Sequence, residues 1–112
     1  MKIIEVKSAA ENPNPRNVNV RMLYDKEHAQ AIYIQLEPGQ RLRKHITPVD
    51  VFFYILEGKG IVEIGDEQEV VCKDMLVESP AKIPHRLLND GEGVFRFLVI
   101  KTPRPTESTQ LL

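Results

Sequence analysis

The sequence predicts an all-β protein, a small barrel or sandwich of antiparallel strands. Short segments rich in β-branched and aromatic residues recur along the chain, separated by Pro, Gly, Asn and Asp. No segment sustains the 3.6-residue periodicity of a long amphipathic helix. We expect strands at the following places: residues 2–6, 18–24, 29–37, 41–47, 51–57, 60–65, 68–72, 75–79, 84–89 and 93–101.

Proline and glycine mark the turns between these strands. In residues 37–40, Pro38 fixes the first φ angle and Gly39 accepts the positive φ that a type II turn requires. Residues 89–93 form a second turn cluster, and the alternating Asn and Pro of residues 12–15 predict a loop, because proline has no amide hydrogen for a ladder.

The chain ends in a segment with almost nothing to bury. We therefore expect one barrel domain over residues 1–102, with its N-terminal strands in residues 1–37 and its core in residues 38–100. Residues 103–112 are predicted to be a disordered tail, since polar and proline-rich termini seldom pack.

Composition narrows the classes of partner. Lys and Arg number 15 against 16 Asp and Glu, giving a net charge of −1, so the chain lacks the basic face of a nucleic-acid binder. The longest apolar run, residues 51–56, is far shorter than the roughly 20 residues that span a bilayer. Glu5 and Lys7 interrupt the apolar start of the chain, and the single cysteine, Cys72, excludes an intrachain disulfide. We expect a cytoplasmic protein with no membrane segment.

The strand around residues 49–56 predicts a covered outer face. Its only polar residue is Asp50, whereas a half-buried strand alternates apolar with polar residues. Either the N-terminal strands or a second copy of the chain can supply the cover, and we expect a homodimer.

The stretch from Gly39 to Gly58 resembles the first motif of the cupin family. That motif reads Gly, five residues, His, one residue, His, three or four residues, Glu, six residues, Gly, and the spacing agrees throughout. His45 occupies the first His position. Thr47 stands at the second His position and Val51 at the Glu position, so two of the three expected ligands are replaced.

Residues 74–89 resemble the second cupin motif, which reads Gly, five residues, Pro, one residue, Gly, two residues, His, three residues, Asn. The matching residues are Pro80, His85 and Asn89. Asp74 and Lys82 stand where the two glycines belong. Alternatively, Lys73 and Asp74 replace the usual Gly-Asp pair, with one residue inserted before the proline. With the stretch between the motifs, the resemblance covers residues 38–100.

This resemblance implies a small jelly-roll β-barrel, the double-stranded β-helix, with the motif side chains pointing inward. In cupins the motif histidines and Glu usually hold iron, manganese, nickel, copper or zinc. Here His45 and His85 are the matching metal donors, and a pair of imidazoles alone should bind such an ion weakly. Asp50 is offset by one residue from the Glu position, and period two sends it to the opposite face unless a bulge corrects the register.

Strand parity predicts which side chains share the interior. His45 and Thr47 project to one face, and the alternating residues of the next strand can line the same interior. Arg43 shares that parity, so a cation at the mouth would favour a carboxylate or phosphate on the ligand. Our leading interpretation is a small-molecule-binding protein with a polar or anionic ligand. The expected ligand-binding residues are Arg43, His45, Thr47, Val51, Phe53 and His85.

Other functions stay open. The alternative is a metal-dependent enzyme of the cupin dioxygenase or isomerase type, with His45 and His85 as metal ligands and an unnamed third donor. A metal-free isomerase or epimerase is conceivable, because either imidazole can exchange a proton near neutral pH. A purely structural or regulatory sensor is a further possibility. The sequence names no substrate.

Each singled-out residue also has an ordinary structural role. In the structural alternative, His45 is one more polar residue on a solvated strand. His85 is then a histidine that is only hydrogen-bonded in the barrel wall. His28 lies in a polar turn and should be solvated. Cys72 is expected to be a small apolar filler. Arg96 belongs to the strand face opposite Phe95 and Phe97, and no role is assigned to it.

Overall fold

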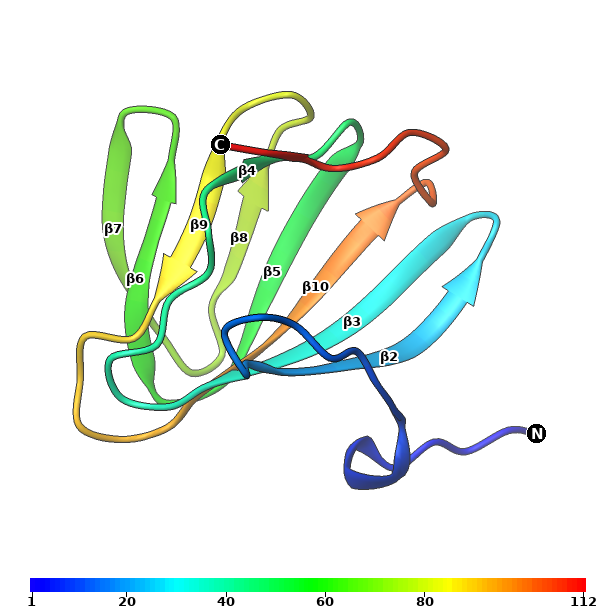
Figure 1. The fold of residues 1–112 in the computed structure, drawn as a ribbon, viewed down its shortest axis with the longest axis horizontal. Helices are drawn as coiled ribbons and strands as arrows, with labels where there is room; N and C mark the ends of the chain where they lie inside the picture. The colour runs from blue at the N-terminus through cyan, green and yellow to red at the C-terminus, as the bar shows by residue number, and fades with distance from the viewer.

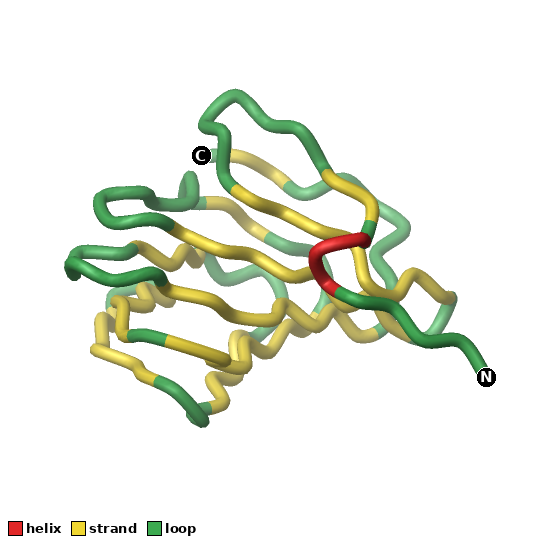
Figure 2. The backbone as a smooth tube through the Cα atoms, turned by 90° about the horizontal axis from the view of Figure 1, so that it is seen from below, coloured by secondary structure: helices red, strands yellow, loops and turns green.

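Two antiparallel sheets face each other in the computed structural model, which describes residues 1–112 (Figure 1). The six-stranded sheet has the order β1 (Ala10–Glu11), β2 (Asn19–Lys26), β3 (Ala29–Leu36), β10 (Phe95–Thr102), β5 (Asp50–Glu57), β8 (Leu76–Ser79). The five-stranded sheet has the order β11 (Gln110–Leu111), β4 (His45–Ile46), β9 (His85–Leu88), β6 (Lys59–Ile64), β7 (Glu67–Cys72). The expected all-β fold is confirmed, and the strands of the two sheets enclose one interior in the perpendicular view (Figure 2).

Alternating side chains build the core between the sheets. On β5 the inward residues Val51, Phe53 and Ile55 are buried, while their neighbours are only half-buried. β10 repeats the pattern, and Val99 pairs with Phe53 across the ladder. Burying such a side chain contributes roughly 1.5–3 kcal/mol to the free energy of unfolding, so these two strands anchor the interior.

The predicted turn at residues 37–40 is confirmed. Gln40 N–H donates to the carbonyl of Glu37 at 2.9 Å, and Gly39 has a φ of +86°. Gly58 also has a positive φ, +83°, and a Cβ there would clash with the carbonyl of Val94. Glycine is therefore required at residue 58 both by backbone conformation and by space.

The strand expected at residues 2–6 is not formed. This part of the chain is exposed and leads into η1 (Val6–Ser8), a single turn of 3-10 helix. The apolar residues Ile3 and Ile4 are exposed and pair with no strand, and Ala10 and Glu11 of β1 are the residues that pair with β2. The strand expected at residues 41–47 is likewise reduced to β4 and one bridge between Arg41 and Leu88.

The final segment differs from the disordered tail that we expected over residues 103–112. β11 pairs with β4, with Leu111 opposite His45, and crosses the top of the molecule in Figure 1. Leu112 N–H donates to the carbonyl of Lys44 at 3.0 Å, and Arg43 Nε donates to the carbonyl of Leu112 at 2.8 Å. An otherwise open edge of β4 offers these backbone partners, and a polar sequence can use them without burying apolar area.

The outer face of β5 is not covered by the N-terminal segment. β1 extends the same sheet beyond β2 instead of crossing over β5. Phe52, Tyr54 and Leu56 are consequently half-buried on this face, beside Leu98 of β10 and the exposed Leu76 of β8. No helix of the chain has the length and apolar character needed to span a membrane, and the expected cytoplasmic location stays a prediction.

Candidate functional site

His45 and His85 meet although 40 residues separate them in sequence. β4 and β9 are neighbours in the five-stranded sheet, and the two histidines are directly paired across the ladder. Directly opposed side chains on one sheet face lie close enough to touch. Their ring centroids are 4.6 Å apart at an interplanar angle of 73°, and the two Nε2 atoms are 3.1 Å apart.

The hydrogen bonds assign one tautomer to this pair. His45 Nδ1 lies 2.9 Å from the carbonyl oxygen of Arg43, which can only accept, so Nδ1 carries the proton. The Nε2 of a neutral His45 is then an acceptor, and the Nε2–H of His85 donates to it.

Two hydroxyl groups complete the network around His85. Ser79 Oγ is 2.6 Å from Nδ1, and with Nε2 protonated the serine hydroxyl donates to that nitrogen. Thr47 Oγ1 is 3.1 Å from Nε2. Because Ser79 ends β8 in the six-stranded sheet, this hydrogen bond ties the two sheets together across the interior. A continuous chain of polar contacts runs from Ser79 through both imidazoles to the backbone of Arg43.

The interior around the pair is apolar, with one further base. The edge of Phe53 faces His85 at a centroid distance of 5.4 Å. Val51 is buried and pairs with Lys101 on one side and Ser79 on the other. Lys101 continues the inward series of Phe97 and Val99 and is half-buried, without an ion pair or a side-chain hydrogen bond.

Burial sets the protonation of these bases. Desolvation, together with the neighbouring His45 and Lys101, lowers the pKa of His85 to about 4. Desolvation also lowers the pKa of His45, against its hydrogen bond to the Arg43 carbonyl, and it lowers the pKa of Lys101. No group of three or more His, Cys, Asp or Glu side chains is placed to hold a metal ion, and no carboxylate is among the buried side chains. Both imidazoles are therefore neutral at pH 7, in a site that contains bases and no acid.

Access to the pair is one-sided. His85 is 1% exposed, whereas His45 is half-buried. Hollows of about 330 to 610 Å³ open elsewhere on the surface, and neither imidazole lines any of them. Since the two rings are in direct contact, a ligand has to be small and has to approach from the edge of His45.

Two residues considered for the site lie outside it. Arg43 is exposed, and only its backbone carbonyl reaches His45, because its side chain turns to Leu112. Asp50 is exposed, and its carboxylate accepts the N–H of Ala81 at 2.9 Å, in agreement with the parity that excluded it from the interior. The structure thus brings together His45, Thr47, Val51, Phe53 and His85, but not the Arg43 side chain.

The remaining singled-out residues have structural roles. His28 is exposed in the turn between β2 and β3, as expected. Cys72 is only half-buried, so the expected buried filler is partly wrong. Arg96 lies on the face opposite Phe95, and its guanidinium donates to Tyr33 Oη at 2.6 Å and to Glu57 at 2.9 Å.

Sequence analysis missed Ser79 and Lys101. Both carried a usable signal, namely strand alternation. Lys101 is the next inward position after Phe95, Phe97 and Val99, and a lysine in such a series is unusual because burying its charge is costly. Ser79 stands two residues after the inward Val77 on a strand that the sequence placed correctly.

The residues present satisfy only part of a metal site. Each Nδ1 has a polar partner, as in metal-bound histidines, and the two Nε2 atoms converge. However, Thr47 and the buried Val51 replace the nitrogen and carboxylate donors, and Lys101 adds positive charge. The three-donor set that holds a catalytic metal is therefore incomplete.

Comparison with known proteins assigns the family. Residues 32–101, more than half of the chain, match the profile of the cupin domain. The chain belongs to the cupin family. This cupin is 33% identical over 72 residues to the uncharacterized protein MJ1618 of Methanocaldococcus jannaschii, across 63% of the chain and 57% of that protein. The chain thus spans little more than half the length of this relative.

Solved structures agree with the cupin fold. TT1209 from Thermus thermophilus is 29% identical, with a TM-score of 0.80 over 94% of this chain and 100% of that one. An uncharacterized protein with a double-stranded β-helix domain from Klebsiella pneumoniae is 15% identical, with a TM-score of 0.84 over 99% of this chain and 96% of that one. The second likeness concerns the fold alone, and it confirms the expected double-stranded β-helix.

The backbone of this cupin has a positive φ at all four positions where the family motifs have glycine. Gly39 and Gly58 have positive φ, as described above. Asp74, with a φ of +70°, and Lys82, with a φ of +66°, occupy the two glycine positions of the second motif. The alignment without an inserted residue is therefore the one that the backbone supports.

Proposed function

We propose that this cupin binds a small organic anion, such as a carboxylate, at the His45–His85 pair. The observation that supports this is the proximity of three basic side chains, His45, His85 and Lys101, in an interior where no carboxylate is buried. An anion would turn this uncompensated set of bases from an energetic cost into an attraction.

Proton uptake would accompany binding. At pH 7 the imidazole pair is neutral because burial penalises its charged form. A carboxylate placed at the edge of His45 favours the charged form and would accept a charge-assisted hydrogen bond from Nε2. The hydroxyl of Thr47 is placed to donate a second hydrogen bond once the contact between the two rings opens.

The test is ligand binding measured by calorimetry on metal-free protein. Acetate, pyruvate and succinate are compared with glucose as an uncharged polar probe. We expect binding of at least one carboxylate and no response to glucose. His45→Gln and Lys101→Met each remove one base. Each variant should reduce the affinity for the carboxylate tenfold or more.

His28→Gln is the matched control, because it removes an exposed histidine in a turn far from β4. It should bind as the wild type does. Carboxylate affinity that is unchanged in both His45→Gln and Lys101→Met, or equal responses to glucose and carboxylates, would refute the proposed site.

A metal-dependent enzyme of the dioxygenase or isomerase type is the second candidate. It is favoured by one observation, the 3.1 Å separation of two Nε2 atoms whose Nδ1 partners orient both rings. Elemental analysis of protein purified without added metal separates the candidates. One equivalent of iron, manganese, nickel, copper or zinc that is lost in His45→Gln would favour the enzyme. Absence of metal in protein that binds carboxylates would favour the anion site.

A second copy of the chain is the partner that we propose for the outer face of β5. Phe52, Tyr54 and Leu56 lie half-buried there, next to Leu98 and Leu76, and no segment of the chain crosses them. A continuous apolar sheet face of this kind is typical of homodimer interfaces.

Sedimentation velocity over a wide concentration range tests the dimer. We expect a dimeric mass for the wild type and a monomeric mass for Leu98→Lys. Val70→Lys, at an exposed position on β7, is the control and should stay dimeric. A wild-type mass of one chain at every concentration would refute the proposed dimer. That result would not affect the proposed anion site.

A further inference from the structure

A second candidate site lies beside β4 and β11, next to the loop before β2. There the loop before β2 faces the segment that leads into β4, and together with β11 they enclose a hollow of about 330 Å³. This volume is at the lower end of the range for small-molecule sites, roughly 300–1,000 Å³. The hollow contains neither histidine of the proposed anion site.

Apolar side chains form the floor of this hollow. Val18 is buried, Val20 and Leu42 pack against the core, and Leu111 is 59% exposed above them. An exposed leucine over a partly buried apolar floor leaves hydrocarbon surface that a ligand could cover. The preferred occupant therefore has an apolar body of several carbon atoms.

Three arginines, Arg16, Arg41 and Arg43, form the rim. None of these three side chains takes part in the five ion pairs of the protein. Each guanidinium carries five N–H donors. Arg16 donates to the carbonyl of Arg41 at 3.2 Å and Arg43 to that of Leu112, and Arg41 has no side-chain hydrogen bond. Most of these donors therefore have no protein acceptor.

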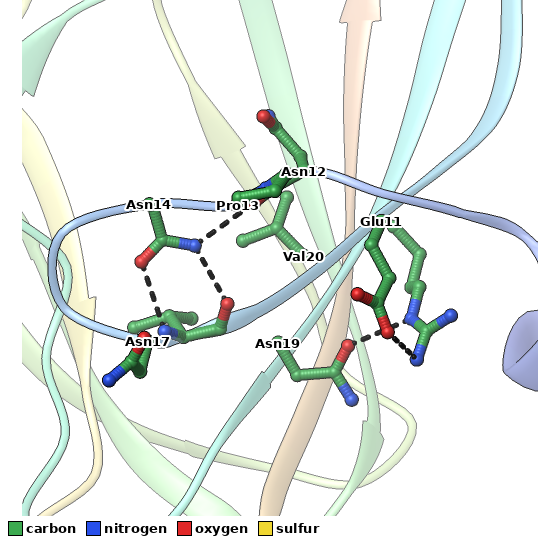
Figure 3. Close-up of a pocket in the computed structure, with 9 residues that line it drawn as sticks. Glu11, Asn12, Pro13, Asn14, Asn17, Asn19 and Val20 are labelled. Atoms are coloured by element: carbon green, nitrogen blue, oxygen red, sulfur yellow. Dashed lines mark hydrogen bonds and ion pairs between the residues drawn. The ribbon is translucent and has the colours of Figure 1, made fainter.

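The loop that carries Arg16 is held in shape by Asn14. Asn14 Nδ2 donates to the carbonyls of Asn12 and Val18, and Val18 N–H donates back to Oδ1 at 3.0 Å (Figure 3). These bonds close the loop on itself, so the backbone that carries Arg16 is ordered before any ligand binds. Preorganisation of this kind reduces the entropy lost on binding.

We propose that this hollow binds an amphipathic carboxylate. Its head group lies between Arg41 and Arg43, whose planar guanidinium groups suit the two oxygens of a carboxylate, and its hydrocarbon part covers Val18, Val20 and Leu42. Neither imidazole lines the hollow, although Leu111 on its wall is paired with His45. The ligand of the hollow differs from a small polar anion in needing the hydrocarbon part.

Calorimetric titration with octanoate tests the proposal. Octanamide keeps the chain without the charge, and acetate keeps the charge without the chain. We expect octanoate to bind at least tenfold more tightly than either. Octyl phosphate, which has a different anionic head group, shows whether the rim selects a carboxylate. Equal affinities for octanoate and octanamide would overturn the proposal.

Two pairs of variants locate the site. Arg41→Gln with Arg43→Gln should reduce octanoate affinity tenfold or more. Lys26→Gln with Lys59→Gln removes the same charge from exposed positions elsewhere and should have no such effect. Unchanged octanoate binding in the arginine variant, or an equal loss in the lysine variant, would contradict the assignment.

His45→Gln separates this proposal from the proposed function. It should weaken small-carboxylate binding at the histidine pair tenfold or more, as stated for the proposed function, while leaving octanoate affinity unchanged. If it removes both, the two ligands share the histidine site and the arginine hollow is refuted. If octanoate binds only through the arginines and no small anion binds at all, the hollow stands and the histidine site fails.

Discussion

The Nε2 atoms of His45 and His85 lie 3.1 Å apart, and the two residues are direct cross-strand partners. A strand pairing places them, an exposed backbone carbonyl orients the first, and a serine from the opposite sheet orients the second. The pair is consequently both a link between the sheets and a buried, neutral base. Protonation of the imidazoles should therefore change both the free energy of unfolding and the binding of a ligand.

Acidification should destabilise this cupin before its carboxylates titrate. The pKa of His85 is about 4 in the folded state and 6.5 when unfolded. Above pH 6.5 both states are neutral and the full stability is present. Between pH 6.5 and 4 only the unfolded state takes up the proton, so the free energy of unfolding falls, by about 2 kcal/mol at pH 5.

Urea unfolding at pH 7.5, 6 and 5 measures this loss. His28→Gln should show the same decrease, because His28 is exposed in both states. His85→Asn should show a smaller decrease, whatever its absolute stability. An identical pH dependence in wild type and His85→Asn would assign the acid sensitivity to other groups.

Strand alternation and motif spacing predicted the centre of the fold and most of the candidate site. They placed Phe53 and Val51 in the interior, and they found His45, Thr47 and His85. Alternation is a reliable guide there because the buried face of each strand is continuous. The same rule would have found Lys101, but a lysine was not expected among buried residues.

The ends of the chain could not be predicted on this basis. β11 has no apolar pattern, and it forms because β4 leaves backbone groups unpaired, a property of the partner strand. Residues 2–6 have the opposite combination, a β-prone sequence that pairs with no strand. In both cases pairing partners decide the structure, and a single sequence does not contain them.

Anion binding should strengthen as pH falls. A carboxylate at His45 stabilises the protonated imidazole, so protons are taken up with the ligand. If one proton is taken up, affinity approaches a tenfold increase per pH unit between pH 8 and 6. Calorimetry in buffers of different ionisation enthalpy counts the protons. Affinity that is independent of pH would show that the imidazole pair takes no part in binding.

Ser79→Ala should loosen the orientation of His85. The hydroxyl donates to Nδ1 at 2.6 Å, and both groups are buried, so the imidazole nitrogen would be left without its partner. A lost buried hydrogen bond costs about 1–3 kcal/mol. Ser108→Ala, at an exposed position, should cost nothing measurable.

Nitrogen NMR of the imidazoles distinguishes a specific role from general packing. In the wild type, His85 should show the Nε2–H tautomer and His45 the Nδ1–H tautomer. Ser79→Ala should alter the His85 signals and leave the tautomer of His45 unchanged, because Arg43 still accepts its proton. Wild-type tautomers opposite to these would contradict the proposed hydrogen-bond direction.

Lys82→Gly should stabilise the protein, although it removes a side chain. Lys82 has a φ of +66°, a conformation that costs a residue with a Cβ roughly 1–2 kcal/mol and costs glycine nothing. Glycine gains more entropy in the unfolded chain, and this entropy offsets roughly 0.5–1 kcal/mol of the gain from the relieved strain. The exposed lysine makes no ion pair, and its backbone N–H keeps its bond to the Thr47 carbonyl. We expect a net gain of up to about 1 kcal/mol by urea unfolding.

Lys73→Gly is the matched control for this gain. Lys73 is also exposed and lies beside Asp74, but its own φ is not positive, so only the entropic cost of glycine remains. It should be destabilised by roughly 0.5–1 kcal/mol. Equal losses in the two variants would mean that Lys82 stores no backbone strain. Opposite signs would show that this loop keeps the backbone of the family's glycine while carrying another residue.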